Sequence, residues 1–394
     1  MNKKEKGYYL DNASNTPLDR RVLSAMKPYL SEKFVGNSHS THDFGVFASQ
    51  AIELSRVKIA TATGFKPNEI YFTSGATESN NWVLKSLALH ELHKENNPKL
   101  HLVVSAIEHA SIMNTCKELE SWGFNITYVK PDSHGVVTAK RVRAALRFNT
   151  LLVCIMAVNN ETGVANPINS IGMIAHQNKT LMMSDCTQLL SYGSTVSKMK
   201  SKYSFVDYFT FSGHKIYGPT GTGCLIARAT APLYPFISGG GQERGLRGGT
   251  SNTAGIVGLG EAVSLIASTD YSKFFEQLYD YLIDQLTKNK IPFLLNAVPD
   301  HKNIVSLNLS KFMNDTDLAS LFANYGIAVS AGSACEASSD GIETKPSHVL
   351  TALGVSEQEA HNTIRVSFSR YTTKKDIDAL VKVIIKLLPK EGNE

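Results

Sequence analysis

The first two thirds of this 394-residue chain alternate between short apolar runs of strand type and longer segments with helical periodicity. A strand-like run at 69–73 precedes a helical pattern over 77–93, and another at 101–105 precedes one over 110–122. This alternation predicts an α/β fold with a mostly parallel sheet, in which ligands bind outside the carboxyl ends of the strands. Further strand patterns occupy 125–129, 151–158, 180–183, 208–211 and 223–226.

The pattern changes after about residue 264. An amphipathic helix is predicted around 271–286, followed by a strand at 305–309 and a short helix that Gly326 can cap. A second strand is predicted at 364–368, and Thr373 with Asp376 forms a capping-box pattern before a final helix. A chain of this length is expected to form two domains. We therefore predict a large domain at 17–264 and a smaller α+β domain at 1–16 and 265–394.

Composition excludes several classes of protein. The formal net charge of +5 is too mild for nucleic acid as the main ligand, although transient contact with tRNA or an acidic partner stays open. No stretch reaches the ~18 apolar residues of a membrane span, and no signal-type apolar run follows the basic N-terminus, so a cytoplasmic location is expected.

Cysteine and histidine spacing gives no sign of a metal site. The five cysteines form no C-x-x-C pair, which argues against a disulfide framework and against structural zinc. His39 and His42 have H-x-x-H spacing, but an ordinary loop explains them better. No resident metal is predicted.

Lys215 follows the apolar run at 208–211, in a turn of small and hydroxyl residues. The strand fixes the backbone, and Gly213 allows a tight turn that can present the amine to a cavity. This arrangement suits covalent attachment of a phosphorylated aldehyde cofactor, with Ser212 and His214 donating hydrogen bonds to an anion. Considered alone, an exposed loop lysine is the competing interpretation.

The segment 73–79 is the best candidate for binding phosphate. A strand ends, Gly75 turns the chain and a helix begins, so that backbone N–H groups and the Thr77 hydroxyl can hold an anion. An ordinary Ser/Thr helix cap is the alternative. Residues 218–225 lack the Lys-Ser/Thr pair of a P-loop, and 239–244 lacks the third glycine of a dinucleotide fingerprint.

Three more polar residues follow predicted strands. Asp185 can pair with a pyridinium nitrogen, and Gln188 can hydrogen-bond a phenolic oxygen of the same ring. His109 can lie flat on that ring and move protons. A helix N-cap for Asp185 and a simple hydrogen-bonded side chain for His109 are the alternatives.

Together these segments resemble the cysteine desulfurases, which are pyridoxal 5'-phosphate (PLP) enzymes of fold type I in the class-V aminotransferase-like family. The resemblance runs from residue 9 to about residue 388. It predicts a large PLP-binding domain with a mostly parallel sheet. The motifs that carry it are Thr73-Ser74-Gly75-Ala76-Thr77-Glu78-Ser79, Glu108-His109, 158–163, Asp185-Cys186-Thr187-Gln188, Ser212-Gly213-His214-Lys215, 239–250 and Ser333-Ala334-Cys335.

The resemblance implies a role for each of these residues. Lys215 would bind the cofactor covalently, His109 would stack on its ring, and Asp185 and Gln188 would hold the ring nitrogen and phenolic oxygen. Thr250 would reach the phosphate in the neighbouring subunit, which implies a homodimer. The phosphate would be held by Ala76, Thr77, Ser212 and His214, and the substrate by Asn37, Asn160 and Arg365, with Asn160 also near the cofactor.

Arg365 has independent support, because it alternates onto the polar face of its predicted strand, where a guanidinium can grip a carboxylate.

Cys335 makes the expected reaction specific. Small and polar residues flank it at 330–341, which predicts a loop with little to anchor it. The resemblance implies that L-cysteine becomes L-alanine while Cys335 receives the sulfur as a persulfide. Cys116, Cys154 and Cys224 are expected to pack in regular elements, and Cys186 has no assigned role.

The long segment after Cys335 resembles that of the long-loop desulfurases. It implies a protein sulfur acceptor, either an iron–sulfur scaffold or a tRNA-thiolation enzyme. Neither a membrane nor stable binding of nucleic acid is expected. The stretch 11–17 differs from the family's usual Ala-Thr-Thr-Pro ending, and Ser38 stands where proline is usual, so the chain departs from the family pattern where substrate is expected to enter. The alternatives are a selenocysteine lyase, another class-V aminotransferase-like enzyme, or a non-catalytic binding protein with this fold.

Overall fold

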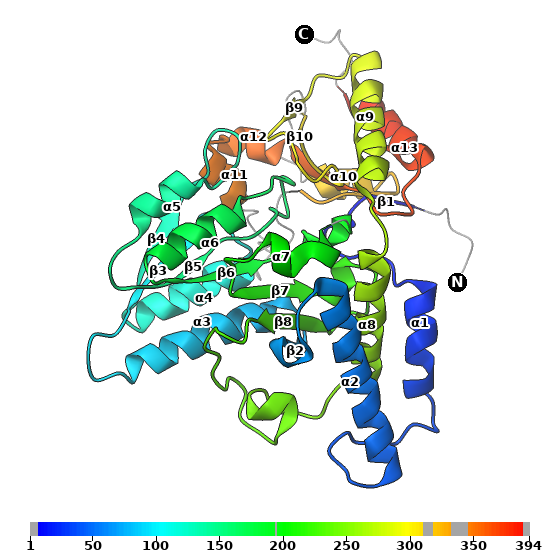
Figure 1. Ribbon diagram of the computed structural model, residues 1–394. Coiled ribbons are helices and arrows are strands. Elements are labelled where there is room, and N and C mark those ends of the chain that lie inside the picture. The colour runs from blue at the N-terminus through cyan, green and yellow to red at the C-terminus, as the bar shows by residue number, and fades with distance from the viewer. Residues whose placement is uncertain (1–6, 194, 310–317, 332–345, 389–394) are drawn as a thin grey trace.

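A seven-stranded sheet forms the centre of the computed structural model (Figure 1), which describes residues 7–193, 195–309, 318–331 and 346–388. The strand order is β2-β8-β7-β6-β5-β3-β4. All neighbouring pairs are parallel except those of β8, which is antiparallel to both β2 and β7, so the predicted mostly parallel α/β sheet is confirmed. The strands are β2 Ile70–Thr73, β3 His101–Ser105, β4 Asn125–Val129, β5 Thr150–Cys154, β6 Leu181–Asp185, β7 Tyr208–Ser212 and β8 Gly223–Ala227.

Helices cover both faces of this sheet, as its apolar strands require (Figure 1). The long helix α2 packs against α8, and α3 packs against α4. The helices of this region are α1 Arg20–Met26, α2 Asp43–Thr63, α3 Ala76–Leu92, α4 Ala110–Ser121, α5 Ala139–Ala145, α6 Ile168–Gln177, α7 Met199–Lys202 and α8 Thr253–Ala267.

One strand is shorter than its apolar run predicts. The run at 151–158 gives a strand that ends at Cys154, because the pairing of β5 with β3 stops at the pair Val104 and Cys154. The chain beyond Cys154 stays beside β6 on its other side, where the amides of Ile155 and Ala157 donate to Met183 and Asp185. Residues 155–158 therefore remain buried beside β6 although they lie beyond the end of β5.

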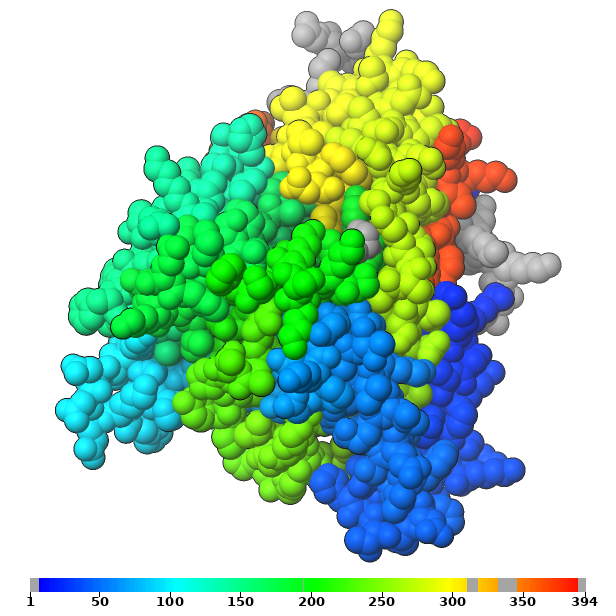
Figure 2. Space-filling view, viewed as in Figure 1, coloured from blue at the N-terminus to red at the C-terminus, as the bar shows by residue number. Residues whose placement is uncertain are grey.

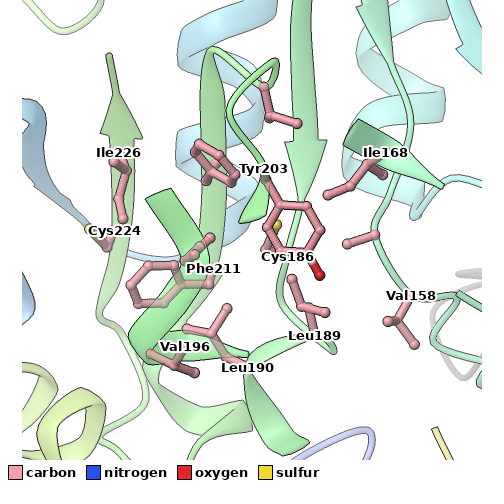
Figure 3. Packing of buried hydrophobic residues seen from close by; sticks show 14 of the residues in the cluster. Val158, Ile168, Cys186, Leu189, Leu190, Val196, Tyr203, Phe211, Cys224 and Ile226 are labelled. Atoms are coloured by element: carbon pink, nitrogen blue, oxygen red, sulfur yellow. The ribbon is translucent and has the colours of Figure 1, made fainter. Parts of the chain in front are cut away.

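The core of the large region lies between the sheet and its covering segments. Phe211, Cys224 and Ile226 from β7 and β8 pack in one cluster with Leu190 and Val196 (Figure 3). β7 is buried along its whole length. A central strand buried on both faces is a rigid base for any residue placed at its end.

The start of β8 and the turn before α3 come unusually close to each other beside the end of β7. A Cβ on Gly223 would lie 2.4 Å from the Cα of Gly75, so no larger residue fits there without moving the backbone. This close approach brings the start of α3 against Ser212, whose Oγ accepts a hydrogen bond from the Ala76 amide at 2.7 Å.

A second hydrophobic cluster belongs to the smaller region. It joins Leu10 to apolar residues of the C-terminal third, including Phe275, Val305, Ile364 and Leu380. The strand order is β12-β10-β9, all antiparallel, and a separate parallel pair joins β1 to β11. The elements are β1 Tyr8–Tyr9, α9 Ser272–Lys288, β9 Leu294–Leu295, β10 Ile304–Asn308, α10 Leu318–Ala323, β11 Ile327–Ala328, α11 His348–Leu353, α12 Glu357–His361, β12 Thr363–Ser367 and α13 Lys374–Leu387.

Two sequence signals in this region are confirmed. Thr373 and Asp376 form the capping box of α13, and Gly326 has the left-handed φ of +75° after α10. We keep the division into 17–264 and 1–16 with 265–394 as a proposal. It is supported by the two clusters, although residue 264 lies in the last turn of α8, whose Ile266 still packs with the large cluster.

Candidate active site

A cavity of about 290 Å³ lies at the carboxyl edge of the parallel strands. Asp185 at the end of β6 and Ser212 at the end of β7 both line it, as does His109 just beyond β3. The predicted site residues that line this one cavity are Ala76, Thr77, His109, Asn160, Asp185, Gln188, Ser212, His214, Lys215 and Arg365.

Lys215 ends a short 3₁₀ turn, Gly213–Lys215, that follows β7 directly. Its Nζ donates hydrogen bonds to the carbonyl oxygens of Ala13 and Ser14, each at 2.6 Å. Gln188 Nε2 donates to the same Ala13 carbonyl at 3.0 Å. The N-terminal segment therefore crosses the cavity and holds the lysine amine beside the predicted ring-binding residues.

The start of α3 forms the part of the cavity where anion binding is predicted. Its N-cap, Gly75, has no side chain, and the amide of Ala76 already donates to Ser212 Oγ, so it is the backbone N–H groups from Thr77 onward that can bind an anion. Ser212 and Thr77 lie at this end, beside His214. Burial, and then the nearby Lys215, lower the pKa of His214 to about 4, so the His214 ring is neutral at neutral pH and can donate one N–H.

Asp185 is buried, and each carboxylate oxygen has a partner. Oδ1 accepts from the Thr187 amide at 2.9 Å, and Oδ2 accepts from Asn80 Nδ2 at 2.9 Å. These contacts fix the plane of the carboxylate at the cavity wall. An acid held in this way suits the protonated nitrogen of a pyridine ring.

His109 is the N-cap of α4, and its Nδ1 accepts from the Ser111 amide at 3.1 Å. Burial is the largest influence on this imidazole and lowers its pKa, while Asp185 opposes the shift. His109 is therefore held toward its neutral form at the cavity wall.

Arg365 lies in β12 and reaches the cavity from the smaller region. Nη1 donates to the Asn160 carbonyl at 3.0 Å, and Nη2 donates to Asp11 Oδ1 at 2.9 Å and to Ser14 Oγ at 2.6 Å. Arg365 Nε and Asn160 Oδ1 are buried without a hydrogen-bond partner among the described residues. An N–H donor group with an unused position inside a cavity fits a carboxylate ligand.

Three predicted residues do not line this cavity. Asn37 and Thr250 are exposed and absent from the cavity wall. Cys335 lies outside the described residues. The four described cysteines, Cys116, Cys154, Cys186 and Cys224, are free and buried. Burial raises the pKa of each of these four thiols, and to about 12 for Cys116, so they are poor nucleophiles at neutral pH.

The structure also brings in residues that the sequence patterns did not assign. Ala13 and Ser14 line the cavity, as does His348, whose Nε2 lies 2.8 Å from the Glu108 carbonyl. Asn80 lies behind Asp185, in the second turn of α3. The only sequence signal for Asn80 is a polar residue on the buried side of a helix, and residues 13–14 were visible only as a departure from a family motif.

The residues present fit PLP. The start of α3 suits its phosphate, a fixed carboxylate suits its ring nitrogen, and a lysine just beyond a buried strand lines the same cavity. Within the part of the chain that the structure describes, no group of three or more His, Cys, Asp or Glu is placed to bind a metal ion. The fold and the site together are those of a PLP enzyme of fold type I.

Comparison with known proteins agrees with this class. The family model described as Aminotransferase class-V matches residues 8–380, and the chain belongs to this family of PLP-dependent enzymes. A protein named cysteine desulfurase IscS from Methanosarcina thermophila is 38% identical over 392 residues, which cover 98% of this chain and 93% of that protein.

Two solved structures extend the likeness to the fold. A NifS-like protein superposes with a TM-score of 0.85 at 34% identity, covering 97% of this chain and 99% of its own. SspA in complex with cysteine superposes with a TM-score of 0.78 at 38% identity, covering 93% of this chain and 100% of its own. The predicted resemblance to the PLP-dependent cysteine desulfurases is confirmed.

Proposed function

We propose that this chain is a cysteine desulfurase that converts L-cysteine to L-alanine and passes the sulfur to a protein acceptor. The observation that carries the proposal is the single cavity that joins Lys215, Asp185 and His109 to Arg365. The relatives named cysteine desulfurase and the neighbour in complex with cysteine support the choice of substrate.

PLP, when bound, accepts the electrons left behind when a bond at the substrate Cα is broken. In the proposed reaction Arg365 and Asn160 hold the substrate carboxylate, and Lys215 Nζ removes the Cα proton. Cys335 Sγ attacks the substrate sulfur. The substrate C–S bond breaks, the carbon skeleton takes up protons to become alanine, and the sulfur stays on Cys335 as a persulfide.

The test is product formation by the purified chain. Alanine and sulfide are measured from L-cysteine with PLP and a thiol reductant present. Equal release of the two products supports the proposal. If L-selenocysteine is turned over and L-cysteine is not, the chain is a lyase of the alternative kind, and if neither is used the desulfurase proposal fails.

Arg365 gives a substrate-binding prediction. Arg365→Lys keeps the charge but loses the planar fork of donors, so we expect KM for cysteine to rise about tenfold to a hundredfold while kcat changes much less. Steady-state kinetics check this, with Arg143→Lys on the exposed face of α5 as the matched control. An unchanged KM would remove Arg365 from carboxylate recognition.

A homodimer is the second part of the proposal. Leu30, Val35, Phe44 and Phe47 are each more than half exposed, near the start of α2. An apolar surface of this kind is typical of an interaction site. Asn37 lies on this segment. A Cβ on Gly241, in the segment that leads to Thr250, would lie 3.9 Å from Cε1 of His39, so the two segments are close together. Figure 2 shows the two segments as adjoining blue and yellow-green lobes.

Asn37 and Thr250 are exposed and absent from the cavity wall, and the proposal assigns both to the dimer interface. In the dimer, Thr250 of each chain would reach the phosphate bound by the other chain, as the family resemblance implies. We expect the parent chain to have twice the mass of one chain by light scattering, and Phe44→Asp with Phe47→Asp to give monomers. Phe148→Asp, at a fully exposed phenylalanine elsewhere, is the control. A monomeric parent with full PLP affinity would refute the dimer.

The sulfur acceptor, an iron–sulfur scaffold or a tRNA-thiolation enzyme, remains part of the proposal. We also propose that the enzyme works in the cytoplasm, a reducing compartment that suits the four free, buried thiols. Among the described residues, none of the helices has the length and apolar character needed to span a membrane.

A further inference from the structure

Asn80 connects three polar side chains beneath the cavity. It is fully buried in α3 and does not line the cavity itself. Its Nδ2 lies 2.9 Å from Asp185 Oδ2 and 2.9 Å from Ser111 Oγ, and its Oδ1 lies 2.6 Å from Thr210 Oγ1. A buried amide with all these bonds made has one low-energy orientation.

The orientation of this amide follows from the chemistry of its partners. An ionised carboxylate can only accept, so the Asn80 atom that faces Asp185 is the NH₂ group. Asn80 Oδ1 then faces the Thr210 hydroxyl, which donates. The second N–H of Asn80 is donated to Ser111 Oγ, which leaves the Ser111 hydroxyl proton for another acceptor.

That acceptor is His109. Ser111 Oγ lies 2.9 Å from His109 Nδ1, and the Ser111 backbone N–H donates to the same nitrogen at 3.1 Å. Two donors directed at Nδ1 leave no room for a proton on it. A neutral imidazole must then carry its proton on Nε2, the nitrogen left for the cavity.

We propose that Asn80 is a positioning residue that holds Asp185 and, through Ser111, fixes His109 as the tautomer protonated on Nε2. A ligand in the cavity therefore meets an N–H donor on His109. Protonation of the ring is opposed, since a proton on Nδ1 would face two other donors. The lowered pKa of His109, caused mainly by burial, agrees with this arrangement.

The value of this tautomer to the reaction depends on the proposed function, but the tautomer itself does not. It is tested on the full-length, PLP-bound protein labelled with ¹⁵N-histidine, with no substrate present. Long-range ¹H–¹⁵N spectra distinguish the two tautomers and follow the titration of each ring. His109→Gln identifies the His109 signals by their loss.

In the parent protein we expect Nε2 of His109 to be protonated. We also expect the ring to stay neutral at pH values below the ordinary histidine pKa. Asn80→Ala and Ser111→Ala both weaken the donation to Nδ1, so the titration midpoint of His109 should move to higher pH. The matched control is Asn81→Ala, because Asn81 is the next residue of α3 and bonds instead to the Thr77 carbonyl and to Thr115.

A second measurement separates the two branches of the network. Asn80→Ala removes a hydrogen bond to a charged acceptor, so PLP should dissociate about tenfold more readily, while Ser111→Ala leaves that bond and the PLP affinity intact. A general loss of packing would not divide in this way. If Asn80→Ala does not fold, Thr210→Val removes the donor that orients the amide, and its effect on the His109 midpoint decides.

Two results would overturn the inference. One is a parent His109 protonated on Nδ1, and the other is an unchanged His109 midpoint in both Asn80→Ala and Ser111→Ala. A parent enzyme that makes no alanine from cysteine would refute the proposed function and leave the tautomer result standing.

Discussion

Lys215→Ala is expected to bind PLP without the visible absorbance of a covalently held cofactor and to lose about 10⁴-fold or more of its cysteine turnover. The reason is the position of Nζ, which is held against the Ala13 and Ser14 carbonyls at 2.6 Å, inside the cavity that also contains Asp185 and His109. No other lysine lines this cavity among the described residues. The variant removes both the covalent attachment and the amine that moves the Cα proton.

The measurement is an absorbance spectrum after incubation with PLP, followed by an assay for alanine. Lys140→Ala, at an exposed lysine of α5, is the control and should match the parent in both. Adding a small primary amine to Lys215→Ala should restore a little turnover if the missing group is the proton acceptor. A Lys215→Ala protein with the parent's spectrum and activity would contradict the assignment of this site.

The sequence could predict the sheet because each strand is a short apolar run bounded by polar or small residues. β3 and β4 begin and end where the pattern places them. β3 is buried along its whole length, whereas β4, at the edge of the sheet, is buried only at Val129. The run at 151–158 predicted a strand that extends four residues beyond the observed end of β5. Apolar character reports burial, and residues 155–158 are buried without being paired on both sides.

The cavity was predictable for a different reason. Asp185 ends β6, Ser212 ends β7, and Lys215 lies three residues further on. Because β6 and β7 are parallel neighbours, these side chains meet at one edge of the sheet. Arg365 was predicted on the polar face of its strand, yet its side chain is buried, because that face meets the N-terminal segment rather than solvent.

Residues that act through others were not predictable in this way. Asn80 resembles any polar residue of a helix until Asp185 and Ser111 are known to lie beside it. Ser14 is separated from Arg365 by 351 positions in the chain, and the N-terminal segment is held beside β12 by the bridge between Asp11 and Ser367. Long-range contacts of this kind leave no local pattern in a single sequence.

Cys335→Ala is expected to keep the visible absorbance of bound PLP while sulfide release from cysteine falls by about 10²-fold or more. The four described thiols are unsuited to this role. Cys116, Cys154, Cys186 and Cys224 are buried, and burial raises the pKa of each, so none of them offers a thiolate at neutral pH. Of the five cysteines in the sequence, Cys335 is the one left to receive sulfur.

Mass spectrometry of the parent after a single exposure to cysteine should find one added sulfur atom on the peptide that contains Cys335. Cys186→Ala is the sharpest control, because Cys186 follows Asp185 directly and lies near the cavity, yet its Sγ is fully buried in the core. That variant should still form the persulfide on Cys335. Added sulfur on Cys186, or undiminished sulfide release by Cys335→Ala, would show that another thiol is the nucleophile. Cys335 would then have no part in the proposed sulfur transfer.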